Sequence, residues 1–461
     1  MVMLGAMIMM PDEAITEVEL SQARTPPVSK RYSVQKRFSR FLRILGPGVV
    51  TGAADDDPSG IATYSQAGAM FGLSMAWVMP FTYPLMTAVQ EACARIGAVT
   101  GKGLAAVVRT HYPKPVLYSV VGLVVFANTL NIGADIGAMA ASAQLLWPQM
   151  PFATAAFVFA VFMLALEIWI PYKTYVKMLK WLALTLFSYV ITAFIVHVSW
   201  TEVWHATWIP HITWSPAYLY ALVGILGTTI SPYLFFWQTS EVVEDEIAAH
   251  RLAQRGGVPR LSRRYLMNLR IDNAFGMLFS NVVAWFIIIV GAVVLHANGV
   301  TEVASAADAA RALEPLVNGW PNAGYWAKVI FAVGIIGIGL LSVPVLAGAS
   351  SYAIAETFGW KEGLYRPLKK ARGFYAVIAV GTLAGLAFNF LDIDTMQALV
   401  FAAVFNGVAA VPLVLLILLI SMRSDIMGEH QSGWWSRLGL LATFILMLGA
   451  AVAMLLSFLP I

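Results

Sequence analysis

The stretch Thr51–Ala67, TGAADDDPSGIATYSQA, decides the fold, because it places three consecutive carboxylates, a proline and a glycine inside an apolar segment long enough to span a membrane. A charged side chain at the bilayer centre costs at least about 2.5 kcal/mol, so three in a row require a function. Pro58 lacks an N–H and disfavours helix at Asp57, and Gly60 adds backbone freedom. The sequence therefore predicts an unwound point in this span, buried in protein or lining a water-filled cavity.

The carboxylates and the carbonyls freed by the break form a set of hard oxygen ligands, which Mg, Ca and Mn ions prefer. We therefore predict a cation site here. One or two of the three acids should face the ion, Asp57 first because it adjoins the break, while the others meet a vestibule or cap the second half-helix. Asp55 is expected on the ion pathway. The expected ligands are Asp56, Asp57, Gly60 and the carbonyls near Ala54, together with Thr228 and Ser231 of the sixth span.

The composition excludes an ordinary soluble protein. Of 461 residues 59% are hydrophobic and 12% charged, and the mean hydropathy is +0.74, so an all-α polytopic membrane protein is predicted. Cys93 is the only cysteine, which rules out an internal disulfide and a multi-cysteine metal site. The seven histidines fall in loops or at span ends, so neither a haem site nor a histidine relay at mid-membrane is expected. We expect no cofactor and no enzymatic activity, because no nucleophile stands with a base.

Segments of about 20 predominantly apolar residues predict eleven membrane spans. Residues 1–43 precede them and are expected to form a disordered cytoplasmic tail rather than a cleaved signal. With this tail inside, all but two of the 29 Lys and Arg residues, Arg311 and Lys328, fall in inner segments or their flanks. This asymmetry predicts a cytoplasmic-membrane protein with the N-terminus inside and the C-terminus outside. The predicted spans are 44–72, 76–98, 116–141, 152–171, 176–199, 216–243, 270–297, 325–356, 373–391, 394–421 and 434–459.

The sixth span repeats the pattern of the first. Residues 225–246 read ILGTTISPYLFFWQTSEVVEDE, and Pro232 follows the small polar residues Thr228 and Ser231 at mid-span. This span lies five after the first and runs in the opposite direction. Two interrupted helices at matched positions predict an inverted-repeat transporter with its site at the membrane midplane. The expected organisation is a first five-helix repeat at 44–215, a second, inverted repeat at 216–421 and an eleventh helix within 422–461.

Other polar positions are less specific. A lone mid-span proline is more often a kink, which is the interpretation for Pro344 and Pro412. Asp135 either forms a structural hydrogen bond or belongs to the pathway, and Asn406 is a weak candidate oxygen ligand. Glu91 and Arg95 are four residues apart and are expected to pair with each other. The aromatic-rich loop at 200–214 is typical of the membrane interface.

The end of the sixth span leaves two alternatives open. Gln238, Glu241 and Asp245 recur on one helical face and are expected to line a route to the cytoplasm. A solvated helix end is the alternative for Glu244, Asp245 and Glu246.

The runs GPGVVTGAADDDPSG, from Gly46, and TTISP in the sixth span resemble the Nramp family of divalent-metal transporters. The resemblance implies a LeuT-like fold of ten core helices plus one. The family's first interrupted helix carries Asp-Pro-Gly-Asn, whose Asp and Asn bind the metal. The matching residues here are Asp57, Pro58, Ser59 and Gly60, so the Asp is kept and the Asn is lost.

The other family motifs also depart from the pattern. Met-Pro-His of the sixth helix, whose Met is a thioether ligand, is Ser231, Pro232 and Tyr233 here, which places Tyr233 on the pathway. A later histidine of that helix aligns with Gln238. An Asp-x-x-Glu pair linked to proton movement aligns with Asp135 and Ala138, so only its Asp remains.

These departures favour a hard ion. A thioether favours Mn, Fe and heavier metals over Mg and Ca, and a serine hydroxyl removes that preference. The pattern resembles the Nramp-related magnesium transporters, which implies transport of a hydrated Mg²⁺, with Mn²⁺ also passing, by alternating access and without proton coupling. The alternatives are a proton-coupled Mn²⁺/Fe²⁺ importer and, less favoured, a cation-coupled amino-acid transporter of the same fold. The expected partners are the ion and the lipid bilayer, with no nucleic acid and no obligate protein.

Overall fold

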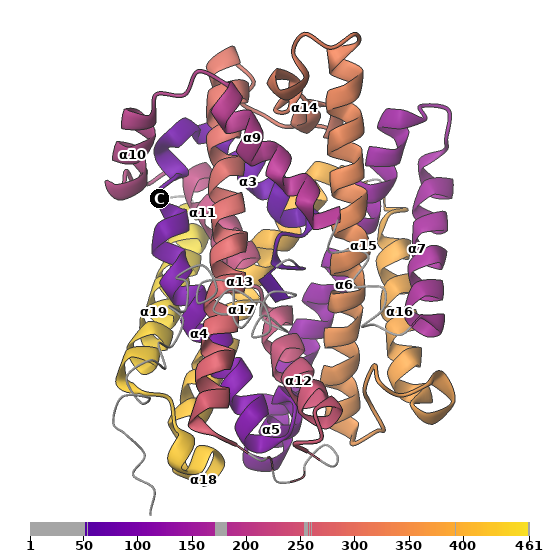
Figure 1. Ribbon diagram of the computed structural model, residues 1–461, viewed down its shortest axis with the longest axis vertical. Coiled ribbons are helices and arrows are strands. Elements are labelled where there is room, and N and C mark those ends of the chain that lie inside the picture. Colours follow the sequence, from indigo (N-terminus) through magenta and orange to yellow (C-terminus); the bar gives the residue numbers. More distant parts are fainter. Residues whose placement is uncertain are drawn as a thin grey trace, which may run out of the picture. The chain divides into compact units, whose positions relative to one another are not determined.

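The computed structural model describes residues 51–52, 54–170, 182–252, 257, 259, 261–391 and 393–459, without the side chains of 182 and 183. The predicted tail at 1–43 lies outside this part of the chain. Every regular element in the described residues is helical, which confirms the predicted class (Figure 1). Within the part of the chain that the structure describes, seven spans are long and apolar enough to cross a membrane, and the bent pair Leu184–Ile195 and Trp200–Trp208 adds an eighth if it counts as one. The chain is a multi-pass membrane protein.

The described part of the first predicted repeat contains seven α-helices and two 3₁₀ helices. They are α3 (Pro58–Phe71), η1 (Gly72–Met75), α4 (Val78–Thr100), α5 (Leu104–His111), α6 (Lys114–Leu146), α7 (Phe152–Trp169), η2 (Leu182–Leu186), α9 (Phe187–Ile195) and α10 (Trp200–Trp208).

The rest of the chain begins with the second interrupted pair. The helices are α11 (Pro216–Thr229), α12 (Pro232–Ala248), α13 (Arg263–Val290), the π-helical turn η3 (Gly291–Leu295), η4 (His296–Asn298), α14 (Ala306–Arg311), η5 (Glu314–Val317), α15 (Ala323–Phe358), η6 (Leu368–Lys370), α16 (Arg372–Phe388), α17 (Thr395–Met422), α18 (Ser424–Met427), η7 (Gly428–His430) and α19 (Trp434–Ser457).

A helix lies within each of the eleven predicted ranges. The long apolar spans are α6, α7, α11 with α12, α13 with its extension, α15, α17 and α19. In the other predicted ranges α3 and α16 are shorter, with 14 and 17 residues, and α4 has 23. The start of the first range and part of the fifth lie outside the described residues, so the count of eleven stays a prediction.

Three helix starts share one local cause. Pro58, Pro216 and Pro232 each occupy the first helical turn, where the missing N–H has no intrahelical partner to lose. Asp57 and Ser215 precede two of these prolines in extended backbone and cap the helix that follows with a side-chain oxygen. The two interruptions predicted from the sequence therefore arise from residues adjacent to them.

The interrupted helices lie in the middle of the helix packing. α3 packs against α11, α13 and α17, and α12 packs against α4 and α15. α6 and α15 lie side by side over much of their lengths, with α7 and α16 beyond them at one edge and α4 and α19 toward the other (Figure 1). α5 and α18 lie at one end of these helices, and α10 and α14 at the opposite end (Figure 1).

The aromatic segment at 200–214 was expected to be a loop, but its first part is a helix. α10 follows α9 with a bend of 119°. Trp204 and Trp208 are 63% and 51% exposed, and Trp214 beyond the helix is 76% exposed. The loop assignment is therefore wrong for α10. A short helix with outward-facing tryptophans is typical of the membrane–water interface. The interfacial position of this segment stays a prediction.

Close helix packing beside the second interruption depends on Gly227. A Cβ at this position would lie 2.0 Å from the Ala403 carbonyl oxygen and 2.7 Å from the Gly407 Cα, so α11 and α17 would have to separate. We expect Gly227→Val to lower the melting temperature of the purified protein, because overpacking costs about 1–3 kcal/mol or more. Gly122→Val on α6 is the matched control, since nothing lies within 4 Å of a Cβ there. Equal melting temperatures for the two variants would contradict this packing.

Candidate functional site

The first interruption lies at Asp56 and Asp57. The chain is helical at Ala54 and Asp55, bends at Asp56, is extended at Asp57 and becomes helical again at Pro58. Asp57 caps α3, because its Oδ1 accepts hydrogen bonds from the Gly60 N–H at 2.7 Å and from the Ser59 hydroxyl at 2.6 Å. The side chain predicted to bind the ion is therefore fixed by the helix that follows it.

The second interruption lies at Ile230 and Ser231, between α11 and α12. Ser231 has extended backbone, and its hydroxyl donates to the Thr228 carbonyl at 2.7 Å. The Thr228 hydroxyl is buried and has no hydrogen-bond partner among the described residues. This break thus presents a free hydroxyl next to freed backbone, which is the oxygen-rich environment expected of a cation site.

The two interruptions meet each other. The Tyr233 hydroxyl donates to the Ala54 carbonyl at 2.9 Å, which joins the start of α12 to the first break across 179 residues of sequence. A Cβ on Gly60 would lie 2.8 Å from the Thr228 hydroxyl, so glycine permits this approach without a shift of the Thr228 side chain. Ser231 lies close to Asp55 as well. Two distant stretches of the sequence therefore meet at one place in the fold.

The three acids do not converge on one point. Asp55 Oδ2 and Asp56 Oδ1 both face the Ser280 hydroxyl of α13, at 2.8 and 3.0 Å, while Asp57 faces α3. All three are at most 1% exposed. No three His, Cys, Asp or Glu side chains of the described residues group as a metal centre. A cation here would thus be held by one or two carboxylates together with neutral oxygens or its own waters.

The negative charge of these acids is not balanced by a described Lys or Arg. Asp55 Oδ1 and Asp56 Oδ2 are buried and have no hydrogen-bond partner among the described residues. Burying a charge without a partner is costly, so a bound cation or a proton has to compensate it. A doubly charged ion at the break would supply this compensation.

Asp135 of α6 faces the first break. Its Oδ2 accepts a hydrogen bond from Ser342 of α15 at 2.9 Å, and Oδ1 has no partner among the described residues. Asp135 is close enough to Asp57 for their charges to interact, and it lies near the backbone N–H of Ser59. The structural role left open by the sequence is therefore present, and the position also suits a role in the pathway.

The remaining predicted pathway residues lie elsewhere. Asn406 of α17 accepts a hydrogen bond from Asn131 of α6 at 2.9 Å. Gln238 and Glu241 are buried in α12, where Gln238 forms a short hydrogen bond with Thr51. Their roles as pathway residues stay predictions.

The solvated helix end considered for Glu244 and Glu246 is wrong. Glu244 is 5% exposed and Glu246 is fully buried. Glu244 accepts hydrogen bonds from the Tyr352 hydroxyl and from the Leu364 N–H, the latter at 2.7 Å. The reason is tertiary: α15 and the segment after it cover this end of α12. The expected pair of Glu91 and Arg95 is present.

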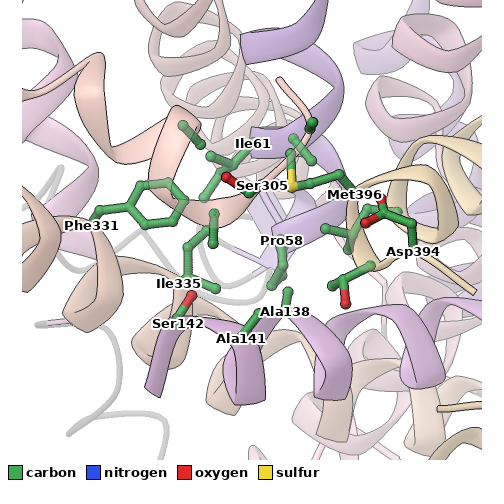
Figure 2. A pocket seen from close by; sticks show the side chains of 16 residues that line it. Pro58, Ile61, Ala138, Ala141, Ser142, Ser305, Phe331, Ile335, Asp394 and Met396 are labelled. Carbon is green, nitrogen blue, oxygen red and sulfur yellow. The ribbon is translucent and has the colours of Figure 1, made fainter. Parts of the chain in front are cut away.

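A cavity of about 130 Å³ reaches the first interruption (Figure 2). Pro58 and Ile61 line it from α3, Ala138 and Ser142 from α6, and Asp394 from the start of α17. Ser142, Asp394 and the bridging Ser280 were not predicted as site residues. Ser142 recurs seven residues after Asp135 on α6, and this spacing is the one sequence signal that could have pointed to it.

Comparison with known proteins identifies relatives. Residues 48–457 match the family described as "Natural resistance-associated macrophage protein-like", or Nramp. The divalent metal cation transporter MntH of Mesorhizobium japonicum is 27% identical over 395 residues, which cover 82% of this chain and 81% of the relative. MntH of Klebsiella pneumoniae is 27% identical over 405 residues, which cover 86% of this chain and 89% of the relative. These names are of transporters, in agreement with the prediction that the chain is not an enzyme.

Solved structures share the fold. A manganese transporter of Eremococcus coleocola matches with a TM-score of 0.69 and 17% identity, covering 91% of this chain and 87% of the other. MhsT, solved with L-phenylalanine, matches with a TM-score of 0.56 and 12% identity. The match covers 89% of this chain and 97% of MhsT. These likenesses confirm the predicted LeuT-like fold. Because the family match extends over residues 48–457, nearly the whole described chain, this protein belongs to the Nramp family.

Proposed function

We propose that the chain is a divalent-metal transporter that carries a hard cation, Mg²⁺ first and Mn²⁺ also, by alternating access and without proton coupling. The observation that carries the proposal is the chemistry of the joined interruptions. The Asp57 carboxylate is buried at the first break, and a Cβ on Gly60 would lie 3.5 Å from its Oδ1 and 2.8 Å from the Thr228 hydroxyl, which places both oxygens around Gly60. The Ser231 hydroxyl contacts the Thr228 carbonyl and the Ala54 carbonyl accepts from Tyr233, so the groups at the two breaks are oxygen ligands. Hard cations prefer such a set.

The absence of soft donors supports the hard-ion preference. Within the described residues around the two breaks, position 231 is serine, and neither a Met, a Cys nor a His takes part in the hydrogen bonds of the site. Mg²⁺ gives up its waters reluctantly and is usually held through one or two carboxylates with several waters kept. Asp55 and Asp56 face Ser280, whereas Asp57 does not. This arrangement suits an ion that is held by few carboxylates and keeps several waters.

Residues of α6 and α12 support transport without proton coupling. Of the Asp-x-x-Glu pair that the family links to proton movement, Asp135 remains and is hydrogen-bonded to Ser342, while Ala138 faces the cavity with a methyl group. Gln238, which does not titrate, stands where the family has a histidine. A proton acceptor is therefore missing at two of three positions.

A proton-coupled manganese importer is the second candidate. The name of the structural neighbour from Eremococcus coleocola, a manganese transporter, favours manganese as the ion, and the MntH relatives are named as divalent metal cation transporters. An amino-acid carrier, as the likeness to MhsT would suggest, is disfavoured because the buried carboxylates would repel an amino acid's carboxylate.

The transport cycle would use the two interrupted helices as the fixed site. One group of helices would rock against the other, so that Asp57 faces each side of the membrane in turn. We infer import into the cytoplasm across the cytoplasmic membrane, with the N-terminus inside and the C-terminus outside, from the distribution of Lys and Arg. The ion and the lipid are the partners required, without an obligate protein subunit.

Reconstituted liposomes test the proposal. The purified protein is placed in vesicles that hold either a Mg²⁺-sensitive or a pH-sensitive dye, and Mg²⁺ or Mn²⁺ is added outside. We expect both ions to enter, with no acidification of the lumen beyond that of empty vesicles. Entry of Mn²⁺ without Mg²⁺ would refute the hard-ion preference, and acidification during Mn²⁺ entry would favour the second candidate.

A further inference from the structure

The cavity that ends at Pro58 continues into a larger one. Ala304, Asp394 and Met396 line both the cavity of about 130 Å³ and a neighbouring cavity of about 1200 Å³. Pro58 adjoins Asp57, so the two cavities together approach the proposed ion site from one side. In the predicted topology this is the outer side, because the segment containing Ala304 connects the seventh and eighth spans.

The charges on the walls of these cavities are negative. Asp394 lines both, and Glu302 lines the larger one. No Lys, Arg or His among the described residues lines either cavity. A cleft that carries one sign of charge between low-dielectric walls concentrates the opposite ion, so these walls attract cations.

The Asp394 carboxylate has acceptor positions that its hydrogen bond with Gln397 does not use. It caps α17, with Oδ1 accepting from the Gln397 N–H at 2.9 Å. A carboxylate has about four acceptor positions, so this cap leaves most of them available. The side chain is exposed, and its carboxylate is turned toward the small cavity (Figure 2).

A buried hydroxyl at the other wall also points to an occupant. Ser142 is 1% exposed, lines the small cavity, and its Oγ has no hydrogen-bond partner among the described residues (Figure 2). A buried hydroxyl without a partner is unfavourable, so Ser142 requires water or an ion's hydration shell. At about 30 Å³ for each water, a cavity of about 130 Å³ has room for roughly four.

We propose that this cavity is a second divalent-cation site, in which a partly hydrated ion waits between Asp394 and Ser142 before it reaches Asp57. The inference rests on the proposed function for the identity of the ion. The ion keeps several waters, as Mg²⁺ does, and exchanges some of them for the Asp394 carboxylate and the Ser142 hydroxyl. The site raises the local concentration of the cation at the entrance to the break.

Cysteine protection tests the site directly. Ala304→Cys puts a thiol on the wall that the two cavities share, and the native Cys93 is buried, so a cationic methanethiosulfonate reagent should react at position 304. We expect saturating Mg²⁺ to slow this reaction several-fold, and Asp394→Asn to remove the protection. Asn keeps the cap of α17, so the variant removes the charge without removing the cap. Protection that persists in Asp394→Asn, or no protection at all, would overturn the proposal.

Transport kinetics give a second readout. Asp394→Asn should raise the apparent KM for Mg²⁺ by about tenfold at low ionic strength, with the difference shrinking in high salt. Asp308→Asn is the matched control, because it removes an acid that pairs with Arg311 and lines neither cavity. An equal KM for Asp394→Asn and the unmodified protein would contradict the proposal.

The failure of this site and the failure of the proposed function are distinguishable. When Asp57→Ala is combined with Ala304→Cys, transport should stop while Mg²⁺ still protects the introduced thiol from the reagent. Protection in a protein that keeps Asp57 but transports neither Mg²⁺ nor Mn²⁺ would support the second site and refute the proposed function. Transport of Mg²⁺ or Mn²⁺ without protection of the introduced thiol would support the proposed function and refute the second site.

Discussion

Asp57→Ala should abolish divalent-cation transport, and Asp57→Asn should reduce it nearly as far. The carboxylate of Asp57 is 1% exposed and lies where the two interrupted helices meet. Removing one partner of a buried, charged contact costs about 3 kcal/mol, which corresponds to a loss of affinity of about a hundredfold. Uptake of Mg²⁺ and Mn²⁺ into dye-loaded liposomes measures the effect.

The two substitutions separate charge from helix capping. Asparagine caps a helix about as well as aspartate, so Asp57→Asn should keep the hydrogen bonds to the Gly60 N–H and the Ser59 hydroxyl. Asp57→Ala loses the cap and should be less stable by about 1 kcal/mol. Melting temperatures measured beside transport therefore show whether lost uptake reflects lost folding.

One result would remove Asp57 from the site. If Asp57→Asn transports Mg²⁺ at the rate of the unmodified protein, the charge at this position does not hold the ion. Asp55 and Asp56, which face Ser280 and have unpartnered oxygens among the described residues, would then be the carboxylates to test.

Ser231→Met should shift selectivity from Mg²⁺ toward transition metals. Ser231 is 1% exposed, stands at the second interruption and lies close to Asp55. A thioether there adds a soft ligand, which Mn²⁺ and heavier metals accept and Mg²⁺ does not. We expect the ratio of Mn²⁺ to Mg²⁺ uptake to rise by about tenfold, equivalent to ~1.4 kcal/mol.

Ser231→Leu is the control for size. Leucine and methionine have similar volumes, so both variants should suffer similar strain where the Ser231 hydroxyl now contacts the Thr228 carbonyl. Only methionine supplies sulfur. If the leucine variant shifts the ratio as far as the methionine variant does, the change comes from packing rather than from the ligand, and the assignment of Ser231 to the site is wrong.

The two interruptions could be predicted because their causes are local. Pro58 and Pro232 cannot donate a backbone hydrogen bond, and each disfavours helix at the residue before it. The structure breaks the helices at Asp57 and at Ser231, the residues directly before these prolines. The long apolar helices could be predicted for a similar reason, since membrane thickness sets their length.

The partners of the acids could not be predicted in this way. Nothing in three adjacent aspartates shows that Asp57 turns to α3 while Asp55 and Asp56 turn to Ser280, which follows them by 225 and 224 residues. Burial of Glu244 by Tyr352 and the backbone at Leu364 was likewise missed, because α15 closes over α12 only in the folded chain.

The sequence by itself determined that this chain crosses the membrane repeatedly and that two of its helices unwind, since hydrophobic length and proline sterics act within a few neighbouring residues. Only the tertiary structure decided that the Tyr233 hydroxyl reaches the Ala54 carbonyl and that a cavity joins Asp394 to Pro58. Contacts of that kind depend on how separate helices pack, and packing is a property of the whole set of helices rather than of any one segment.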